Sequence, residues 1–142
     1  MLAAMLTAAG VAPGLDRNCD GGVCYGTSGA DVLYGSSVKD TIYGLGGDDK
    51  VVGRGGDDGL KGGPKRDRVN GGEGDDRVRG TLGTEVVYGG PGDDLVRGGD
   101  PERPNHGVKD VLDCGPGVDT VYFTPGQDVV RDNCEIENPP AP

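Results

Sequence analysis

Single aliphatic residues recur along the chain at intervals of nine, and each lies among polar or small residues. Between residues 26 and 97 the members of this series are Leu33, Ile42, Val51, Leu60, Val69, Val78, Val87 and Val96. One apolar residue in a short extended segment is typical of a β-strand, because alternate side chains face opposite sides. One such strand cannot build a core, but stacked strands can, since each aliphatic side chain then rests on those of neighbouring coils. The pattern predicts an all-β solenoid of nine-residue units.

A glycine and an acid keep a fixed distance from each aliphatic residue. If the glycine is position 1 of a unit, the acid is position 6 and the aliphatic residue is position 8. The position-1 glycines are Gly26, Gly35, Gly44, Gly53, Gly62, Gly71, Gly80 and Gly89. The position-6 acids are Asp31, Asp40, Asp49, Asp58, Asp67, Asp76, Glu85 and Asp94. Because glycine permits positive φ and aspartate favours turns, positions 1–6 are expected to form a turn and positions 7–9 a strand. Glycine at this density excludes a helix, at about 1 kcal/mol per Gly relative to Ala.

The phase of the repeat slips by seven residues and then resumes. The extra residues are 98–104, where Pro101 and Pro104 break any strand, so a surface loop is expected there. Three further units then put Asp110, Asp119 and Asp128 at position 6 and Leu112, Val121 and Val130 at position 8. The predicted organisation is a signal-like leader at 1–16, an N-terminal cap with a cysteine pair at 17–25, eight repeats at 26–97, an inserted loop at 98–104, three further repeats at 105–131, and a C-terminal cap and tail at 132–142.

Composition narrows the partners of the chain. Of its 142 residues 30 are Gly, one is Phe and none is Trp, so an ordinary globular core is hard to build. The net charge of −10 makes nucleic acid and anionic membrane surfaces poor partners, because phosphate binding needs a basic face. Composition alone is compatible with a disordered chain or with acids that bind a cation. The strict phase of the acids favours the second interpretation.

The units "GGEGDDRVR" at 71–79 and "GGPGDDLVR" at 89–97 resemble the nonapeptide G-G-x-G-x-D-x-U-x of repeats-in-toxin (RTX) proteins at every specified position. The resemblance extends over about residues 26–131. It implies a right-handed parallel β-roll in which each unit forms half a coil. It also implies Ca²⁺ ions between successive turns on the same edge, held by position-6 carboxylates and turn carbonyls. Ca²⁺ takes six to eight oxygen ligands, which such turns can provide.

The two edges of such a roll are expected to differ. Units two apart share an edge, so the first edge holds the units that begin at 35, 53, 71, 89 and 114. Four of these keep Gly at position 4 and Asp at position 6, and only the first, with Val38 at position 4, departs from the motif. The second edge has Lys65–Arg66 in the turn before Asp67, and it has Glu85 in place of Asp. We expect a calcium-rich first edge, a second edge that binds mainly near its N-terminal end, and Lys65 or Arg66 as a substitute for a missing cation.

The expected calcium ligands are Asp31, Asp49, Asp58, Asp76, Asp94 and Asp119, together with the turn glycines Gly56, Gly74 and Gly92. A single acid in a Gly-rich turn is ordinarily a solvated turn residue, and the regular phase is what favours ligands here. The position-5 acids are a different case, for which turn stabilisation is the preferred interpretation. They are Asp48, Asp57, Asp75 and Asp93.

The cysteines lie outside the main array, with Cys19 and Cys24 before it and Cys114 and Cys134 at its end. An even number at both caps favours disulfides in an oxidising compartment. Cys114 and Cys134 are about one coil apart, so stacking can bring them within bridging distance. A zinc site and free thiols are the alternatives, although the only histidine, His106, lies in a degenerate unit.

The ends and the tyrosines add less specific information. Residues 1–12 are apolar and resemble the end of a secretory signal without its basic region, and they are too short to span a membrane. The five tyrosines fall at position 9 if Tyr25 closes a degenerate unit, so they are expected to face outward and to stack between coils or to form a binding stripe.

Three classes of function are compatible with a solenoid. The preferred one is a non-catalytic, extracellular calcium-binding β-roll that folds when Ca²⁺ binds. The alternative is a secreted adhesion or interaction module that uses an outward face, whereas ice binding is disfavoured because threonine is scattered among positions. An enzyme is not expected, because His106 has no nucleophile partner visible in the sequence and the acids follow the repeat.

Overall fold

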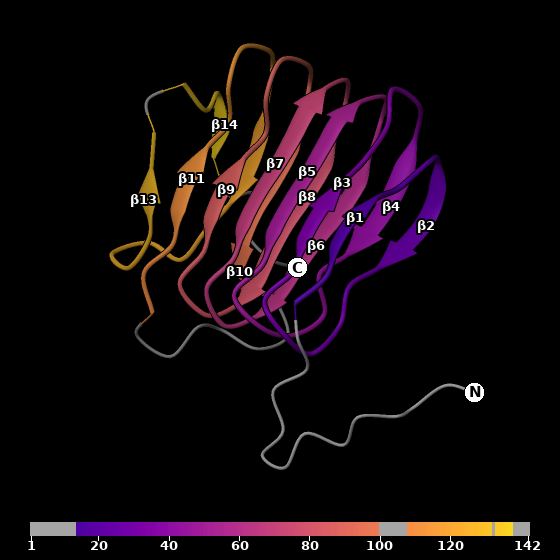
Figure 1. The fold of residues 1–142 in the computed structure, drawn as a ribbon. Coiled ribbons are helices and arrows are strands. Elements are labelled where there is room, and N and C mark those ends of the chain that lie inside the picture. Colours follow the sequence, from indigo (N-terminus) through magenta and orange to yellow (C-terminus); the bar gives the residue numbers. More distant parts are fainter. Residues whose placement is uncertain (1–13, 100–107, 132, 138–142) are drawn as a thin grey trace, which may run out of the picture.

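The computed structural model of the protein describes residues 14–99, 108–131 and 133–137, and these residues form two parallel β-sheets without a helix. The odd-numbered sheet contains, in order, β1 (Asp16–Asn18), β3 (Val32–Tyr34), β5 (Lys50–Gly55), β7 (Arg68–Glu73), β9 (Val86–Tyr88), β11 (Val111–Asp113) and β13 (Val129–Val130). The even-numbered sheet contains β2 (Gly22–Tyr25), β4 (Asp40–Tyr43), β6 (Gly59–Pro64), β8 (Arg77–Leu82), β10 (Leu95–Gly99), β12 (Thr120–Tyr122) and β14 (Ile136–Glu137). Consecutive strands alternate between the sheets, so the chain winds as a solenoid and the predicted parallel β-roll is confirmed (Figure 1).

Strands stack with the eighteen-residue step that two nine-residue units predict. Val51 pairs with Val69 in the odd-numbered sheet, and Leu60 pairs with Val78 in the even-numbered sheet. After β10 the step lengthens by seven residues, since Val96 pairs with Val121. The register of the units therefore resumes on the far side of 98–104. Residues 100–107, including Pro101, Pro104 and His106, lie outside the described part of the chain.

The core is a double row of position-8 side chains between the two sheets. The buried members are Leu33, Ile42, Val51, Leu60, Val69, Val78, Val87, Val96, Leu112 and Val121, each at most 2% exposed. Val130 is partly buried at the C-terminal end of the row. Burying one such side chain stabilises a fold by about 1.5–3 kcal/mol. This is too little to hold a single rung in place, so the stability of each rung depends on the rungs stacked against it.

Several strands are longer than the three residues that the repeat predicts. β5, β6, β7 and β8 each run for six residues, so the expectation that strands end at position 9 is wrong for the central coils. Pairing continues into the following turn, where Arg54 pairs with Gly72 and Gly63 pairs with Thr81. Turns of the same length stack directly on one another, and this keeps their backbones within pairing distance.

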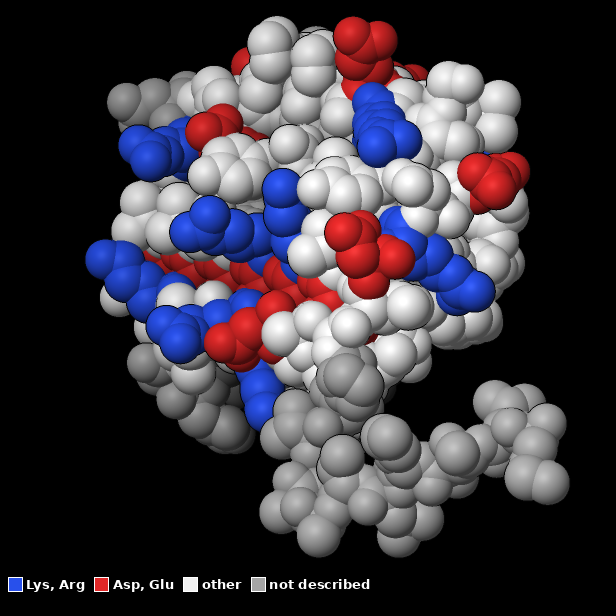
Figure 2. Space-filling model, viewed as in Figure 1, with Lys and Arg blue, Asp and Glu red and all other residues white. Residues whose placement is uncertain are grey.

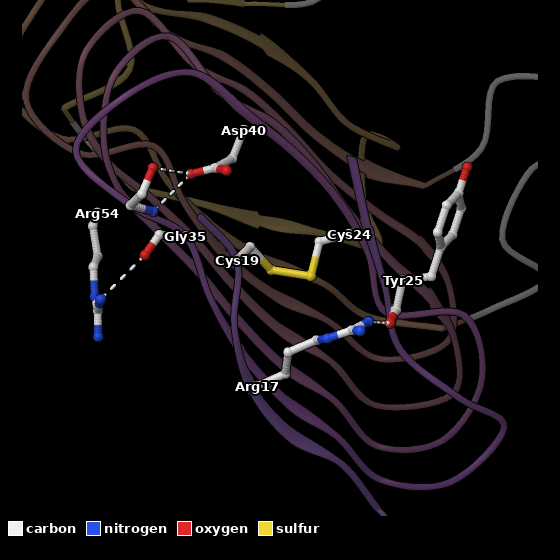
Figure 3. The surroundings of a disulfide bond; sticks show 8 residues. Arg17, Cys19, Cys24, Tyr25, Gly35, Asp40 and Arg54 are labelled. Carbon is white, nitrogen blue, oxygen red and sulfur yellow. Dashed lines mark hydrogen bonds between the residues drawn. A yellow bond between two sulfur atoms is a disulfide. The ribbon is translucent and has the colours of Figure 1, made fainter. Parts of the chain in front are cut away.

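Both ends of the roll carry a disulfide among the described residues. Cys19 and Cys24 are bonded at the N-terminal end (Figure 3), and Cys114 and Cys134 are bonded at the C-terminal end. All four cysteines are used, so neither the zinc nor the free-thiol alternative fits this structure. Arg17 adds a hydrogen bond from its guanidinium to the carbonyl oxygen of Tyr25 (Figure 3).

The first strand, β1, begins at Asp16, and Leu15 packs against the core, whereas residues 1–13 of the predicted leader lie outside the described residues. Within the described part of the chain, no helix is long and apolar enough to cross a membrane.

Candidate metal-binding edges

The position-6 acids lie inside the roll, immediately before the strands. The first edge carries Asp40, Asp58, Asp76, Asp94 and Asp119, and the second carries Asp31, Asp49, Asp67, Glu85 and Asp110. Each of these side chains is at most 3% exposed, so the alternative of a solvated turn residue is wrong for them. Asp40, Asp67 and Asp110 were not among the expected ligands, although their phase in the repeat places them in the same two columns.

One oxygen of most of these carboxylates joins two coils, and Asp40 and Glu85 are the exceptions among the described residues. The backbone N–H of Asp40 donates to Oδ1 of Asp58 at 2.7 Å, and those of Asp58 and Asp76 donate to the next acid of the first edge at 2.8 Å. The series continues from Asp94 to Asp119 across the register shift. Sequence reasoning missed this role, because nothing in a nine-residue motif identifies the acceptor of its position-6 N–H. These acids therefore join the stacked coils through hydrogen bonds that need no metal ion.

The other carboxylate oxygen is left without a partner in the central coils. Within the described residues, a buried Oδ2 accepts no hydrogen bond in Asp49, Asp58, Asp67, Asp76, Asp94 and Asp119. A buried carboxylate oxygen without a partner is costly unless a cation or a proton is supplied. Ca²⁺ is a hard cation that prefers oxygen ligands, so the unpartnered oxygens indicate that the residues of the edges fit this ion.

Asp31 differs from the central acids. Its Oδ1 accepts the N–H of Leu15 at 2.6 Å, and its Oδ2 accepts the backbone N–H and the hydroxyl of Thr27. Asp40 likewise accepts the N–H and hydroxyl of Ser36 on one oxygen. In these two units the hydroxyl residue at position 2 donates to one oxygen of its own carboxylate, and Asp31 is the expected ligand whose two oxygens both accept hydrogen bonds.

Burial gives the central carboxyl groups a high affinity for protons. Desolvation raises the pKa of Asp58 and Asp94 to about 6 and that of Asp67 and Asp76 to about 7, and neighbouring carboxylates add to the effect. Burial also raises the pKa values of Asp49 and Asp119. A raised pKa means that the charged form of the carboxyl group is costly in the fold. A cation beside the group stabilises that charged form.

Glycine at position 1 leaves room at these oxygens. A Cβ on Gly71 would overlap both the carbonyl oxygen of Gly89 on the next coil and Oδ2 of Asp76. The same overlap arises at Gly53, with the carbonyl oxygen of Gly71 and Oδ2 of Asp58. Glycine therefore recurs at position 1 because a side chain has no room there, and not because the backbone has a positive φ. A carboxylate and a carbonyl oxygen face the space that each missing Cβ leaves.

Glycine at position 4 serves a different purpose on the first edge. Gly56, Gly74, Gly92 and Gly117 all have positive φ, between 99° and 148°. A Cβ on Gly74 would overlap the carbonyl oxygen of Gly56, and one on Gly92 would overlap that of Gly74. The position-4 carbonyls thus point along the edge toward the next turn, where they can contribute oxygen ligands.

Side chains alone do not complete a metal site. Among the described residues, no three His, Cys, Asp or Glu side chains converge on one point. A Ca²⁺ ion at either edge would therefore need backbone carbonyl oxygens beside one or two carboxylates. This donor set is typical of Gly-rich calcium turns rather than of a cluster of acids.

The second edge is interrupted at Glu85. Both carboxylate oxygens of Glu85 lack a hydrogen-bond partner, and in the described part of the chain no bond joins the N–H of Asp67 to Glu85. Burial, together with the neighbouring Asp110, raises the pKa of Glu85 to about 9. Arg66 does not fill this gap, because its guanidinium pairs with the exposed Asp48 at 3.7 Å. No ion pair joins Lys65 or Arg66 to Asp67 within the described residues, so a substitute cation is not seen there.

Three of the position-5 acids, Asp57, Asp75 and Asp93, form a second ladder on the outside of the first edge. The N–H of Asp75 donates to Oδ1 of Asp57 at 3.0 Å, and the N–H of Asp93 donates to Oδ1 of Asp75 at 2.9 Å. This ladder runs opposite to that of position 6, from the later coil to the earlier one. The hydrogen bonds agree with the prediction that these acids stabilise turns, and they show that the stabilisation acts between coils.

Charges of both signs lie close together on the surface. On the face shown in Figure 2, a narrow band of acidic atoms runs between Lys and Arg side chains. The net charge of −10 is therefore not spread evenly over the molecule.

The geometry defines a class, the parallel β-rolls with acidic, glycine-rich edges. A family model for the RTX calcium-binding nonapeptide repeat matches residues 25–60, 55–84 and 79–100, which together make up more than half of the chain. The chain belongs to the family of RTX calcium-binding repeat proteins. No curated protein and no solved structure matches the chain significantly.

Proposed function

We propose that this protein is a secreted, non-catalytic β-roll whose folding depends on Ca²⁺ bound between successive turns. The observation that carries the proposal is the row of buried, unpartnered Oδ2 atoms along the edges. A row of buried carboxylates without counterions opposes the fold, and ions bound only by the folded state stabilise it by mass action.

The first edge has the most complete set of candidate ligands. Asp58, Asp76, Asp94 and Asp119 would supply carboxylate oxygens, and Gly56, Gly74 and Gly92 would supply carbonyl oxygens. On the second edge, Asp49 has the same unpartnered oxygen, whereas the oxygens of Asp31 are already engaged. When bound, Ca²⁺ contributes the positive charge that neither edge provides from its own side chains. The residues hold the turns in register and exclude water from the carboxylates.

The disulfides support an extracellular location. Both ends of the roll are closed by a disulfide, and such bonds persist in oxidising compartments. Extracellular calcium modules bind with Kd values of about 10⁻⁴–10⁻³ M, so the same protein would remain unfolded at low cytosolic calcium. We also propose that the repeats have no catalytic role, because their acids are engaged by backbone N–H groups and follow the structural period.

A calcium titration of the whole protein tests this function. Circular dichroism and calorimetry should show a cooperative gain of β-structure together with the binding of several ions, and excess chelator should reverse both. Mg²⁺ should be a poor substitute, since it demands a smaller octahedral shell.

Amide exchange provides the site-resolved part of the same test. Residues 44–97 should become protected in calcium and exchange rapidly in chelator, whereas the disulfide-closed caps retain partial protection. Protection of 44–97 that is equally strong with chelator and with calcium would contradict the proposal.

A further inference from the structure

The outward face of the even-numbered sheet carries a basic strip in an acidic protein. Position-9 side chains of this sheet stack in register as Tyr25, Tyr43, Lys61, Arg79, Arg97 and Tyr122. Three cations therefore lie on consecutive rungs, about 4.8 Å apart. Arg77 adds a fourth at position 7 of β8, and no acid occupies position 7 or 9 of the strands from β2 to β12 in this sheet.

The sheet is hollowed along β6. A depression of about 450 Å³ has Gly59 at its floor, with Thr41 and Tyr43 of β4 on one side and Arg77 and Arg79 of β8 on the other. Adjoining depressions continue it at both ends of β6, toward Asp57 and Asp75 in one direction and toward Leu45 and Pro64 in the other. The central depression extends across β4, β6, β8 and β10, so this trough runs across the strands, along the row of position-9 side chains.

The cations of the trough form no ion pair with the acids of the described residues. Within the described residues, no salt bridge joins Lys61, Arg77, Arg79 or Arg97 to an acid. Arg97 lies over the ring of Tyr122 at 4.3 Å, and its Nε has no hydrogen-bond acceptor among the residues that the structure describes. Like charges stacked on neighbouring strands repel one another, so a bound anion would stabilise this arrangement.

We propose that this trough binds a single chain of an acidic polysaccharide carrying carboxylate or sulfate groups. Arginine and lysine at strand spacing match negative groups that recur along an extended chain. Tyr43, stacked on Tyr25 with ring centroids 5.2 Å apart, offers a flat apolar wall for sugar rings. The strip thus combines charge with an aromatic surface along one row that crosses β4, β6, β8 and β10.

Duplex nucleic acid fits the same surface poorly. It carries one charge per 1.7 Å or so of helix axis and needs a broad basic face. Here the strip is a single row of side chains that crosses the strands, and Asp57 and Asp75 lie beside it toward one end of β6. A thin chain with widely spaced charges can lie on the strip without meeting these acids.

Dextran derivatives provide matched probes, because one backbone can be obtained neutral, carboxymethylated or sulfated. In millimolar calcium, the protein should bind carboxymethyl dextran and dextran sulfate and should not bind neutral dextran. Binding should weaken with added salt. Failure to bind either charged dextran would overturn the proposal, and so would stronger binding to duplex DNA.

A pair of double variants locates the site. Lys61→Gln with Arg79→Gln removes two cations that are paired across β6 and β8, and Lys50→Gln with Arg68→Gln removes an identically paired Lys and Arg from the odd-numbered sheet. The first pair should weaken binding of dextran sulfate by at least about fivefold, and the second should leave it unchanged. Equal losses in both pairs would show non-specific attraction and refute the proposed site.

Tyr43→Ser separates a polysaccharide site from a general polyanion site. It should weaken binding of dextran sulfate without changing the salt dependence, and it should leave binding of poly-glutamate unaffected. An unchanged affinity for dextran sulfate would argue against sugar recognition. Circular dichroism in calcium verifies that each variant is folded, so a failure of calcium-dependent folding is recorded separately from a failure of polysaccharide binding.

Discussion

The backbone N–H of Asp58 donates to Oδ1 of Asp76 at 2.8 Å, while Oδ2 of the same carboxylate is buried without a hydrogen-bond partner. One side chain therefore joins two coils and also leaves an oxygen for a cation. The two roles can be separated, because an amide retains the acceptor oxygen and removes the charge.

Asp76→Asn should keep the coils joined and weaken calcium-dependent folding. The amide oxygen can still accept the N–H of Asp58, but an ion next to it loses a charged ligand. Asp76→Ala should be worse by about 1–3 kcal/mol in calcium, since it also leaves that buried N–H without an acceptor. Calcium titrations followed by circular dichroism measure the first effect, and urea unfolding in saturating calcium measures the second.

Two controls accompany these variants. Asp75→Asn changes the neighbouring exposed acid, which keeps an acceptor for the N–H of Asp93, so its calcium midpoint should stay close to that of the parent protein. Asp67→Ala alters the second edge, where the ladder is already interrupted at Glu85, and should shift the midpoint less than Asp76→Ala. Equal midpoints for the two alanine variants would contradict the difference between the edges.

Acid should stabilise the calcium-free fold. The pKa of Asp76 rises from 3.8 to about 7 in the fold, so between these values the native state binds more protons than the unfolded chain. Stability in chelator is therefore greatest at the acid end of this window and falls as pH rises through about 7. Asp58, Asp67 and Asp94 act in the same direction. Circular dichroism in chelator should therefore show more β-structure at pH 5 than at pH 8.

Calcium should reverse this dependence. Ca²⁺ and protons compete for the same buried oxygens, so calcium affinity should fall as pH drops below about 7. A calcium-free β-structure content that does not change between pH 5 and pH 8 would show that these carboxyl groups are not buried as the structure places them.

Gly71→Ala should destabilise the roll by about 1–3 kcal/mol, because the added methyl group overlaps the carbonyl of Gly89 and the carboxylate of Asp76. Gly59→Ala is the matched control, since its Cβ would meet nothing closer than 3.8 Å. That variant should unfold within about 0.5 kcal/mol of the parent protein. Thermal or urea unfolding in saturating calcium distinguishes the two, and similar losses for both would contradict the close contact of coils at position 1.

Leu45→Gly should stabilise the fold by about 0.5–1 kcal/mol. Leu45 has a φ of 78°, which costs an L-residue about 1–2 kcal/mol, and glycine recovers this at a smaller entropic cost. Thr27→Gly is the control at the equivalent position 2. It should instead destabilise, because Thr27 has no positive φ to relieve and its hydroxyl donates to Asp31. A loss of stability in Leu45→Gly would disprove the assigned turn conformation.

Much of the architecture is predictable from the sequence. The unbroken period of nine identified Val78 and its equivalents as the core, and the stacking step of eighteen residues followed from two units per coil. A strand that slips by one residue turns its only apolar side chain to solvent, so the register is strongly determined by Val78 itself. The resumption of the phase after 98–104 likewise predicted that Val96 would stack on Val121.

The tertiary structure decided what each polar group contacts. The sequence identified Asp76 as a turn acid, but its buried oxygens and the N–H of Asp58 meet only because two coils lie one strand spacing apart. The sequence also predicted glycine-rich turns, but it did not show that Leu45 and Lys65 adopt positive φ within them. Their conformation follows from the stacking of these turns on their neighbours. The basic trough across β6, β8 and β10 depends in the same way on which rungs become neighbours. A local motif encodes conformation along the chain, whereas contacts eighteen or twenty-five residues apart arise only when the coils pack.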